Sequence, residues 1–522
     1  MRQLPAEKKL QNPGRDGTGL QGTQFYCARS SVAFTQRPGT FTPIIVLAQK
    51  RPTNDPTDEE WMRFDLYARY IRRVESIGPG DHDDLVDWGQ FFPRYNRDTP
   101  ILPRLVHLGV LNIYLPFPII SALFPHTLES VCLSGYSGSL GTSGFRYPLR
   151  NALATLSATA CNIRKIRVAY FGKPIGEQLK PLQKFKSLNK LDIGCSDSIK
   201  DLVTLGPIAS LRCLSLTGFH FPLDLDYHIF GDRFQSLEYL TIDADATTIG
   251  GVARFIQAVS FPHLRRFDVK VEVESSPEHP DLPNFHLHIA KHIFDVFAPM
   301  PSTIQHVSCS LFTIEHPQLT TTINIHPCFV KPILHLRNLT SVKIGCETQY
   351  TAYTLDDASL AAMAAAWPLL QTLEISPSSE ITSENWHPSA VQPTVRGLAV
   401  FAERCPSLKT LLIKTLIEVD NLPSTVADMP PPSGHRLKRL VVGLDREQYD
   451  DATCLRLALY VDALFPNIQD LPHPLRAGPL TWWEYQSRVS NPFGVEVSNM
   501  LFAIHLGRRS AETGRAKHVA AE

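Results

Sequence analysis

The sequence lacks any imbalance of charge, with 51 Lys and Arg residues against 51 Asp and Glu residues in a chain of 522. Such a chain has no overall field that draws it to nucleic acid, anionic membranes or acidic substrates. We therefore expect no nucleic acid and no membrane among its partners. Apolar runs of roughly 18 residues, which a membrane-spanning helix requires, are also missing, and residues 1–30 contain no apolar signal-peptide core. These absences predict a soluble protein of the cytoplasm or nucleus.

Paired cysteines are missing as well. The ten cysteines stand singly, without a CxxC pair or a tight cluster. Disulfides and structural zinc are therefore not expected. Cys213, Cys309 and Cys405 lie beside or inside apolar stretches, where a free thiol behaves as a small hydrophobic group. We predict that the cysteines fill the core.

Catalytic signatures are missing too. No GxSxG motif occurs, and no cysteine lies in a known nucleophile signature. The Gly/Ser-rich segment 135–144 lacks the Gly-Lys-Ser/Thr ending that holds phosphates and magnesium, so we interpret it as a surface loop. We predict no catalytic residue, no cofactor-binding residue and no cofactor, and we expect that the protein is not an enzyme.

One histidine cluster raises the question of a metal site. His286, His288 and His292 include a pair four residues apart, which a helix would place on one face. No HExxH glutamate follows, and Ile289, Ile293 and Phe294 supply an apolar face. We favour an amphipathic helix with exposed histidines and predict no metal ligand.

A short apolar pattern recurs along the chain. Apolar residues at positions i, i+3 and i+5 form twelve copies of an LxxLxL-like unit, the core of a leucine-rich repeat. The copies are Leu105, Leu108, Val110; Leu128, Val131, Leu133; Ile163, Ile166, Val168; Leu188, Leu191, Ile193; Leu211, Leu214, Leu216; Leu237, Leu240, Ile242; Leu264, Phe267, Val269; Ile304, Val307, Cys309; Leu339, Val342, Ile344; Leu370, Leu373, Ile375; Leu408, Leu411, Ile413; and Leu437, Leu440, Val442. A thirteenth, at Ile468 and Leu471, is incomplete.

The pattern predicts a fold. The i+3 and i+5 positions point the same way from a short strand, and the first position tucks in at the preceding turn. Helical segments with start signals at Asp356, Asp357 and Thr394 precede the units, each followed by a proline, as also at Pro262 and Pro466. We predict an α/β leucine-rich-repeat solenoid, a horseshoe with a parallel concave sheet and convex helices. A doubly wound α/β domain is the alternative, although one open sheet seldom holds twelve strands.

The flanking segments divide the chain. We expect a disordered segment at 1–43, a helical cap at 44–100, the solenoid at 101–475, a C-terminal cap at 476–507 and a flexible tail at 508–522. The cap prediction rests on the near-helical apolar series from Trp61 to Val74. Arg69, Arg72 and Arg73 interrupt this series, and acidic residues in 81–84 balance them, which favours a solvated helix face over a nucleic-acid site. Surface loops are expected at 134–144, 274–283 and 426–435.

Several segments resemble a known family. They are Arg51-Pro52, Trp61-Met62-Arg63-Phe64, Tyr67 to Val74, Leu102-Pro103-Arg104-Leu105, Trp367 to Leu373, Cys405 to Leu411 and Leu464 to Ile468. In this order they resemble the large fungal family of F-box proteins with leucine-rich repeats, over roughly residues 45–475. The family's F-box opens with a Leu-Pro-x-Glu-like segment. Leu4 to Glu7 fits that opening, but no amphipathic helical module follows it, so we expect the F-box to be absent or truncated.

The resemblance implies a function. In that family the F-box docks a Skp-type adaptor of a cullin-RING ubiquitin ligase, and the repeats hold a protein substrate. The implied partners are a protein on the concave face, a Skp-type adaptor and a cullin. The alternative is an adaptor-independent protein-interaction scaffold without a ubiquitin role, which the missing F-box favours. No protein-binding residue is assigned, but ten polar positions beside the apolar anchors are expected at the surface: Arg104, His107, Lys190, Arg212, Glu238, Arg265, Lys343, Glu374, Lys409 and Lys438.

Overall fold

The computed structural model describes most of the repeat region. The described residues are 58–77, 100–112, 121–134, 149–169, 176–195, 198–205, 208–245, 247–273, 292, 295–313, 321–324, 329–347, 351–377, 392–416, 418–419, 422–423, 428–431, 434–443, 450–468, 500–501 and 503–504. The predicted segments 1–43 and 508–522, nearly all of 476–507, all of the predicted loop 274–283 and nearly all of the predicted loop 134–144 lie outside them, whereas six of the ten residues of the predicted loop 426–435 lie within them.

One parallel sheet runs through the molecule. Its 13 strands lie in the order of the sequence, and each pairs in parallel with the next one. The strands are β1 (Arg73–Ile77), β2 (His107–Asn112), β3 (Ser130–Ser134), β4 (Lys165–Ala169), β5 (Lys190–Gly194), β6 (Cys213–Thr217), β7 (Tyr239–Asp245), β8 (Arg266–Val273), β9 (His306–Thr313), β11 (Ser341–Glu347), β13 (Thr372–Pro377), β14 (Thr410–Leu416) and β15 (Arg439–Gly443). A doubly wound domain would reverse the strand order part-way, so this order excludes it.

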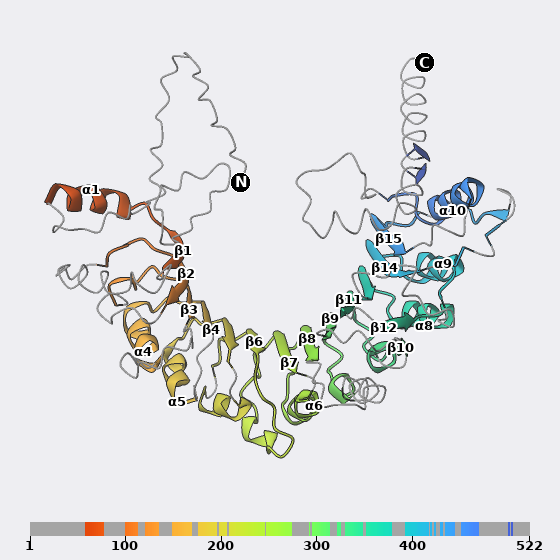
Figure 1. The fold of residues 1–522 in the computed structure, drawn as a ribbon. Helices are drawn as coiled ribbons and strands as arrows, with labels where there is room; N and C mark the ends of the chain where they lie inside the picture. Colours follow the sequence, from red (N-terminus) through yellow and green to blue (C-terminus); the bar gives the residue numbers. More distant parts are fainter. Residues whose placement is uncertain are drawn as a thin grey trace, which may run out of the picture.

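Helices lie outside the arc that the sheet forms (Figure 1). They are α1 (Asp58–Ala68), α4 (Leu149–Thr159), α5 (Gly176–Leu179), α6 (Ile249–Ala258), α8 (Asp357–Ala366), α9 (Val395–Arg404) and α10 (Asp451–Leu464), with 3-10 helices at Lys180–Lys184, Ile199–Leu205, Tyr227–Phe230 and Lys331–Ile333. A second, two-stranded parallel sheet pairs β10 (Thr321–Asn324) with β12 (Thr351–Thr354). None of the helices in the described ranges is long and apolar enough to cross a membrane.

The predicted start signals cap their helices. The Asp356 carboxylate accepts the N–H of Ser359 at 2.8 Å, and the Thr394 hydroxyl accepts the N–H of Arg396 at 3.2 Å. Both bonds satisfy amides that have no partner within the helix. The predicted start signals of α8 and α9 are therefore confirmed.

A backbone ladder joins the repeats. In each repeat the two N–H groups that follow the first anchor both donate to one carbonyl of the preceding repeat. Asn189 and Lys190, for example, donate to the Arg164 oxygen at 2.9 and 3.0 Å. The accepting carbonyls run from Arg72 to Lys409 without a missed repeat. This fixed register makes the chain an α/β leucine-rich-repeat solenoid, as its sequence pattern predicted.

Polar side chains strengthen the turns before the strands. The residue just before the first anchor is often Ser, Thr or Asn, and it donates to a carbonyl of the preceding repeat. Ser210 donates to the Leu188 oxygen at 2.7 Å and Thr303 to the Leu264 oxygen at 2.8 Å. Asn338 donates to the Ser302 oxygen, two residues before the preceding first anchor Ile304, at 2.9 Å. These bonds give hydrogen-bond partners to turn carbonyls that the backbone ladder does not use.

Apolar anchors fill the space between the sheet and the helices. Leu191, Leu240 and Leu373 are fully buried, as are nearly all anchors whose burial is described. Near the middle of the arc, aromatic rings replace aliphatic filling. Phe255 of α6 makes tilted or edge contacts with five rings, at centroid distances of 5.4–6.3 Å: Phe221, Tyr227, Phe230, Phe234 and Phe261.

The structure corrects the prediction for residues 44–100. Trp61 to Val74 was expected to be helical throughout, but α1 ends at Ala68 and β1 begins at Arg73. Ile71 and Val74 are buried under the sheet as anchors of an additional first repeat. Arg72 and Arg73 thus lie at the start of a strand and not on a helix face.

Candidate protein-binding face

The concave surface of the sheet is built from the residues between the anchors. Because side chains alternate along a strand, the neighbours of each buried anchor point to the open side. The register stacks them in columns. The first column holds the first strand position of each repeat: Arg73, His107, Ser130, Lys165, Lys190, Cys213, Tyr239, Arg266, His306, Ser341, Thr372, Thr410 and Arg439.

Two further columns flank this one. The edge column is the position before the first column, whose carbonyls from Arg72 to Lys409 accept the bonds of the ladder: Arg72, Val106, Glu129, Arg164, Asn189, Arg212, Glu238, Arg265, Gln305, Thr340, Gln371, Lys409 and Lys438. The second column lies between the two strand anchors: Cys132, Arg167, Asp192, Ser215, Thr241, Asp268, Ser308, Lys343, Glu374, Leu412 and Val441.

Charge is distributed unevenly over these columns. The edge and first columns together contain eleven Lys and Arg residues and only two acidic residues, Glu129 and Glu238. In the second column, by contrast, Asp192, Asp268 and Glu374 outnumber its two cations, Arg167 and Lys343. The edge of the concave sheet at which the strands begin is therefore basic, although the chain as a whole is neutral.

Ion pairs tie neighbouring strands across this face. Lys343 and Glu374 approach to 2.8 Å between β11 and β13, and Arg212 pairs with Glu238 along the edge column. Arg266 pairs with Asp268 on the same strand at 2.8 Å. Exposed pairs of this kind contribute little stability, about 0–1 kcal/mol. The backbone ladder, and not these pairs, therefore keeps the strands in register.

The ten predicted surface positions all reach the surface. Seven are exposed, and Lys190, Glu238 and Glu374 are half-buried. The prediction missed several other residues of the concave columns, chiefly Lys165, Arg167, Tyr239 and Arg266. They stand at the same offsets from the anchors as the predicted residues, so the repeat register was the signal that could have found them.

The cysteine prediction is correct for the core and wrong for the concave face. Cys195, Cys309, Cys405 and Cys454 are buried. Burial raises the pKa of the Cys405 thiol to about 12. Cys132 and Cys213 are instead half-buried on the sheet surface and Cys161 is exposed, so apolar neighbours in sequence did not ensure burial.

The two concave thiols are poor nucleophiles. Desolvation raises the pKa of Cys132 and of Cys213, and it outweighs the opposing influence of the nearby cations Arg167 and Lys190. The thiolate is the reactive form of cysteine, so a raised pKa leaves both groups protonated at neutral pH.

Of the predicted histidine cluster, only His292 lies within the described residues. Its Nδ1 is 3.8 Å from a carboxylate oxygen of Asp295. The described residues hold no group of three His, Cys, Asp or Glu side chains with the geometry of a metal site. His286 and His288 lie outside the described ranges.

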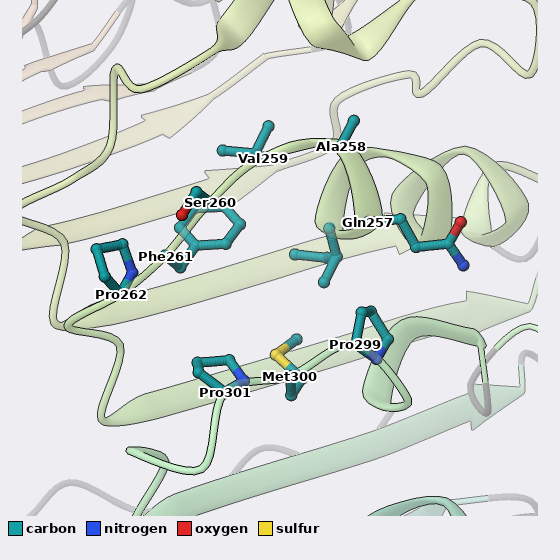
Figure 2. A pocket seen from close by; sticks show the side chains of 10 residues that line it. Gln257, Ala258, Val259, Ser260, Phe261, Pro262, Pro299, Met300 and Pro301 are labelled. Atoms are coloured by element: carbon teal, nitrogen blue, oxygen red, sulfur yellow. The ribbon is translucent and has the colours of Figure 1, made fainter.

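A pocket of 340 Å³ lies on the helix side, between the repeats of β8 and β9. Figure 2 shows residues 257–262 on one side and Pro299, Met300 and Pro301 on the other. Gln257 and Ser260 are its only polar side chains, and both are exposed. Without a titratable group in its lining, this pocket offers no acid or base for catalysis.

Comparisons with known proteins give little beyond the architecture. No protein-family model and no curated protein matches the chain. Similar solved structures include the leucine-rich-repeat-containing protein LegL7 from Legionella pneumophila, with 14% identity over 63% of this chain and 97% of that chain and a TM-score of 0.32. Another is the leucine-rich-repeat protein LIC12759 of Leptospira interrogans, with 10% identity over 68% and 91% and a TM-score of 0.16. The assignment of the fold rests on this chain's own register and ladder.

Proposed function

We propose that the protein is a non-catalytic receptor that holds a protein partner on the concave face of its sheet. The observation that carries the proposal is the fixed array of polar and charged side chains over 13 aligned strands. The backbone ladder holds the strands that carry this array in register before any partner arrives, which reduces the ordering cost of binding. Tyr239, 40% exposed in the first column, supplies the kind of aromatic anchor that dominates binding energies.

A direct test blocks this face without changing its charge. In the second column, Ser215→Tyr with Ser308→Tyr adds bulk at two half-buried positions. The matched control is Ala158→Tyr with Ala452→Tyr, at exposed positions on α4 and α10. Proteins that co-precipitate with the tagged full chain from its native cells are expected to be lost with the concave pair and kept with the control pair. Equal capture by both variants would refute a concave binding site.

We propose further that the receptor belongs to a cullin-RING ubiquitin ligase, on the strength of the motifs shared with fungal F-box repeat proteins. The same co-precipitation tests this second proposal by scoring a Skp-type adaptor and a cullin. Recovery of both would support it, whereas their absence beside concave-face partners would leave an adaptor-independent scaffold. The two results separate the alternatives because the adaptor and the cullin are scored independently of the partners held on the concave face.

A further inference from the structure

The basic residues of the concave face are most concentrated over five consecutive strands. From β4 to β8, the edge, first and second columns carry seven cations: Arg164, Lys165, Arg167, Lys190, Arg212, Arg265 and Arg266. We call these seven the basic track. The same columns contain only three carboxylates, Asp192, Glu238 and Asp268. The track therefore keeps a net positive charge on a chain that is neutral overall.

The carboxylates do not neutralise the track. Asp192 is shared by two lysines at the limit of ion-pair distance, with Lys165 at 4.0 Å and Lys190 at 3.8 Å. Within the described part of the chain, no carboxylate comes within 4.0 Å of Arg167. The paired cations also stay accessible, because Lys165, Lys190, Arg212 and Arg266 keep 43–63% of their side-chain surface exposed.

We propose that the basic track binds an acidic, extended segment of the partner protein, with Tyr239 packing against an apolar side chain of that segment. This deepens the proposed function and rests on it. Four strand spacings of about 4.8 Å span roughly 19 Å, the length of about six extended residues. Arginine guanidinium groups along the track suit carboxylates because they can donate two parallel hydrogen bonds to one acid.

The composition of the track favours an acidic peptide over a nucleic acid. Asp192, Glu238 and Asp268 lie among the cations and would repel a continuous line of phosphates. A peptide can place neutral residues opposite these carboxylates, since only some of its side chains are charged. Single-stranded nucleic acid also requires a series of aromatic rings for base stacking, whereas Tyr239 is the only aromatic residue in the track's three columns.

The test uses the full chain and three fluorescein-labelled probes in fluorescence anisotropy. One probe is a peptide of about eight residues that alternates Glu and Ser, the second replaces Glu with Lys, and the third is an oligothymidylate of similar length. The track variant combines Lys165→Glu, Arg167→Glu and Lys190→Glu. The control combines Arg150→Glu, Arg396→Glu and Arg404→Glu, which makes the same charge change at exposed positions on α4 and α9. Circular dichroism confirms that both variants are folded.

We expect the acidic peptide to bind the wild-type chain, to bind at least about tenfold more weakly to the track variant, and to keep its affinity for the control. Raising salt from about 50 to 300 mM should weaken binding, because these charges are exposed. Failure of the wild type to bind, equal loss in the control, or tighter binding of the oligothymidylate would overturn the proposal. A captured partner could bind the track variant as strongly as the wild type yet be lost with the Ser215 and Ser308 pair. That result would refute the basic track alone and leave the proposed concave site supported.

Discussion

At the scale of single residues, Gly251 stands where no side chain fits. A Cβ at this position of α6 would lie 2.0 Å from the backbone oxygen of Phe221, which cannot move without shifting the repeat. Gly251→Ala should therefore lower stability by about 1–3 kcal/mol or more, seen as a lower Tm. Gly194→Ala is the control, since its Cβ would meet nothing closer than 3.8 Å. Equal Tm values for the two variants would contradict the close packing of α6 against Phe221.

His435 gives the structure a dependence on pH. Its Nδ1 accepts the Leu437 N–H at 3.1 Å, so Nε2 carries the proton and donates to the Cys405 oxygen at 2.9 Å. Burial lowers the pKa of this imidazole from 6.5, and the bond to Cys405 only partly opposes the shift. The unfolded chain then takes up the proton first, so stability is complete above pH 6.5 and declines as pH falls toward the folded pKa.

The comparison with a variant isolates this contribution from those of other histidines. His435→Gln cannot titrate, and it should be less stable than the wild type near pH 7.5. The difference in Tm should shrink by about pH 5, because only the wild type loses stability from this site. A constant difference across this range would show that His435 does not titrate as its burial implies.

At the scale of elements, one carboxylate links two helices. Asp357 at the start of α8 accepts the backbone N–H of Thr394 at 2.8 Å and its hydroxyl at 2.6 Å, which fixes the start of α9. Asp357→Ala should destabilise α9 by about 1–2 kcal/mol, because the Thr394 groups lose their partner. Hydrogen exchange should show faster exchange in α9 while α6 is unchanged. Glu403→Ala, an exposed change on α9, serves as the control.

The strands were predictable where their pattern is complete. All twelve copies of the repeat form strands because both strand anchors are apolar in every copy, and nearly all anchors whose burial is described are buried. β1 was missed because the polar residue Ser76 occupies the second of its two strand anchor positions, at i+5. β10 and β12 were missed because four residues are too few to show a period. The concave columns follow from the register, but the Arg212–Glu238 pair joins residues 26 positions apart. Only the actual stacking of neighbouring repeats brings such residues together.

At the scale of the whole molecule, each repeat is stabilised mainly by its two neighbours. Leu191→Ala in β5 should cost about 2–5 kcal/mol, because this anchor is fully buried. We expect the damage to stay local: hydrogen exchange should accelerate in β4 to β6 and remain unchanged in β14 and β15. Leu455→Ala, at a position that is 46% exposed on α10, should leave both regions unaffected. Uniform acceleration along the chain would indicate a single cooperative unit instead.

The strand register does not depend on the length of the connecting segments. First anchors are 23 residues apart from Leu105 to Leu128 and 40 apart from Leu264 to Ile304, yet β8 and β9 remain paired along eight residues without a bulge. Insertions and deletions in these connections can thus accumulate during evolution without moving a concave side chain. The same property makes the connection between β8 and β9 a suitable place to graft a fluorescent or affinity domain without displacing the concave side chains.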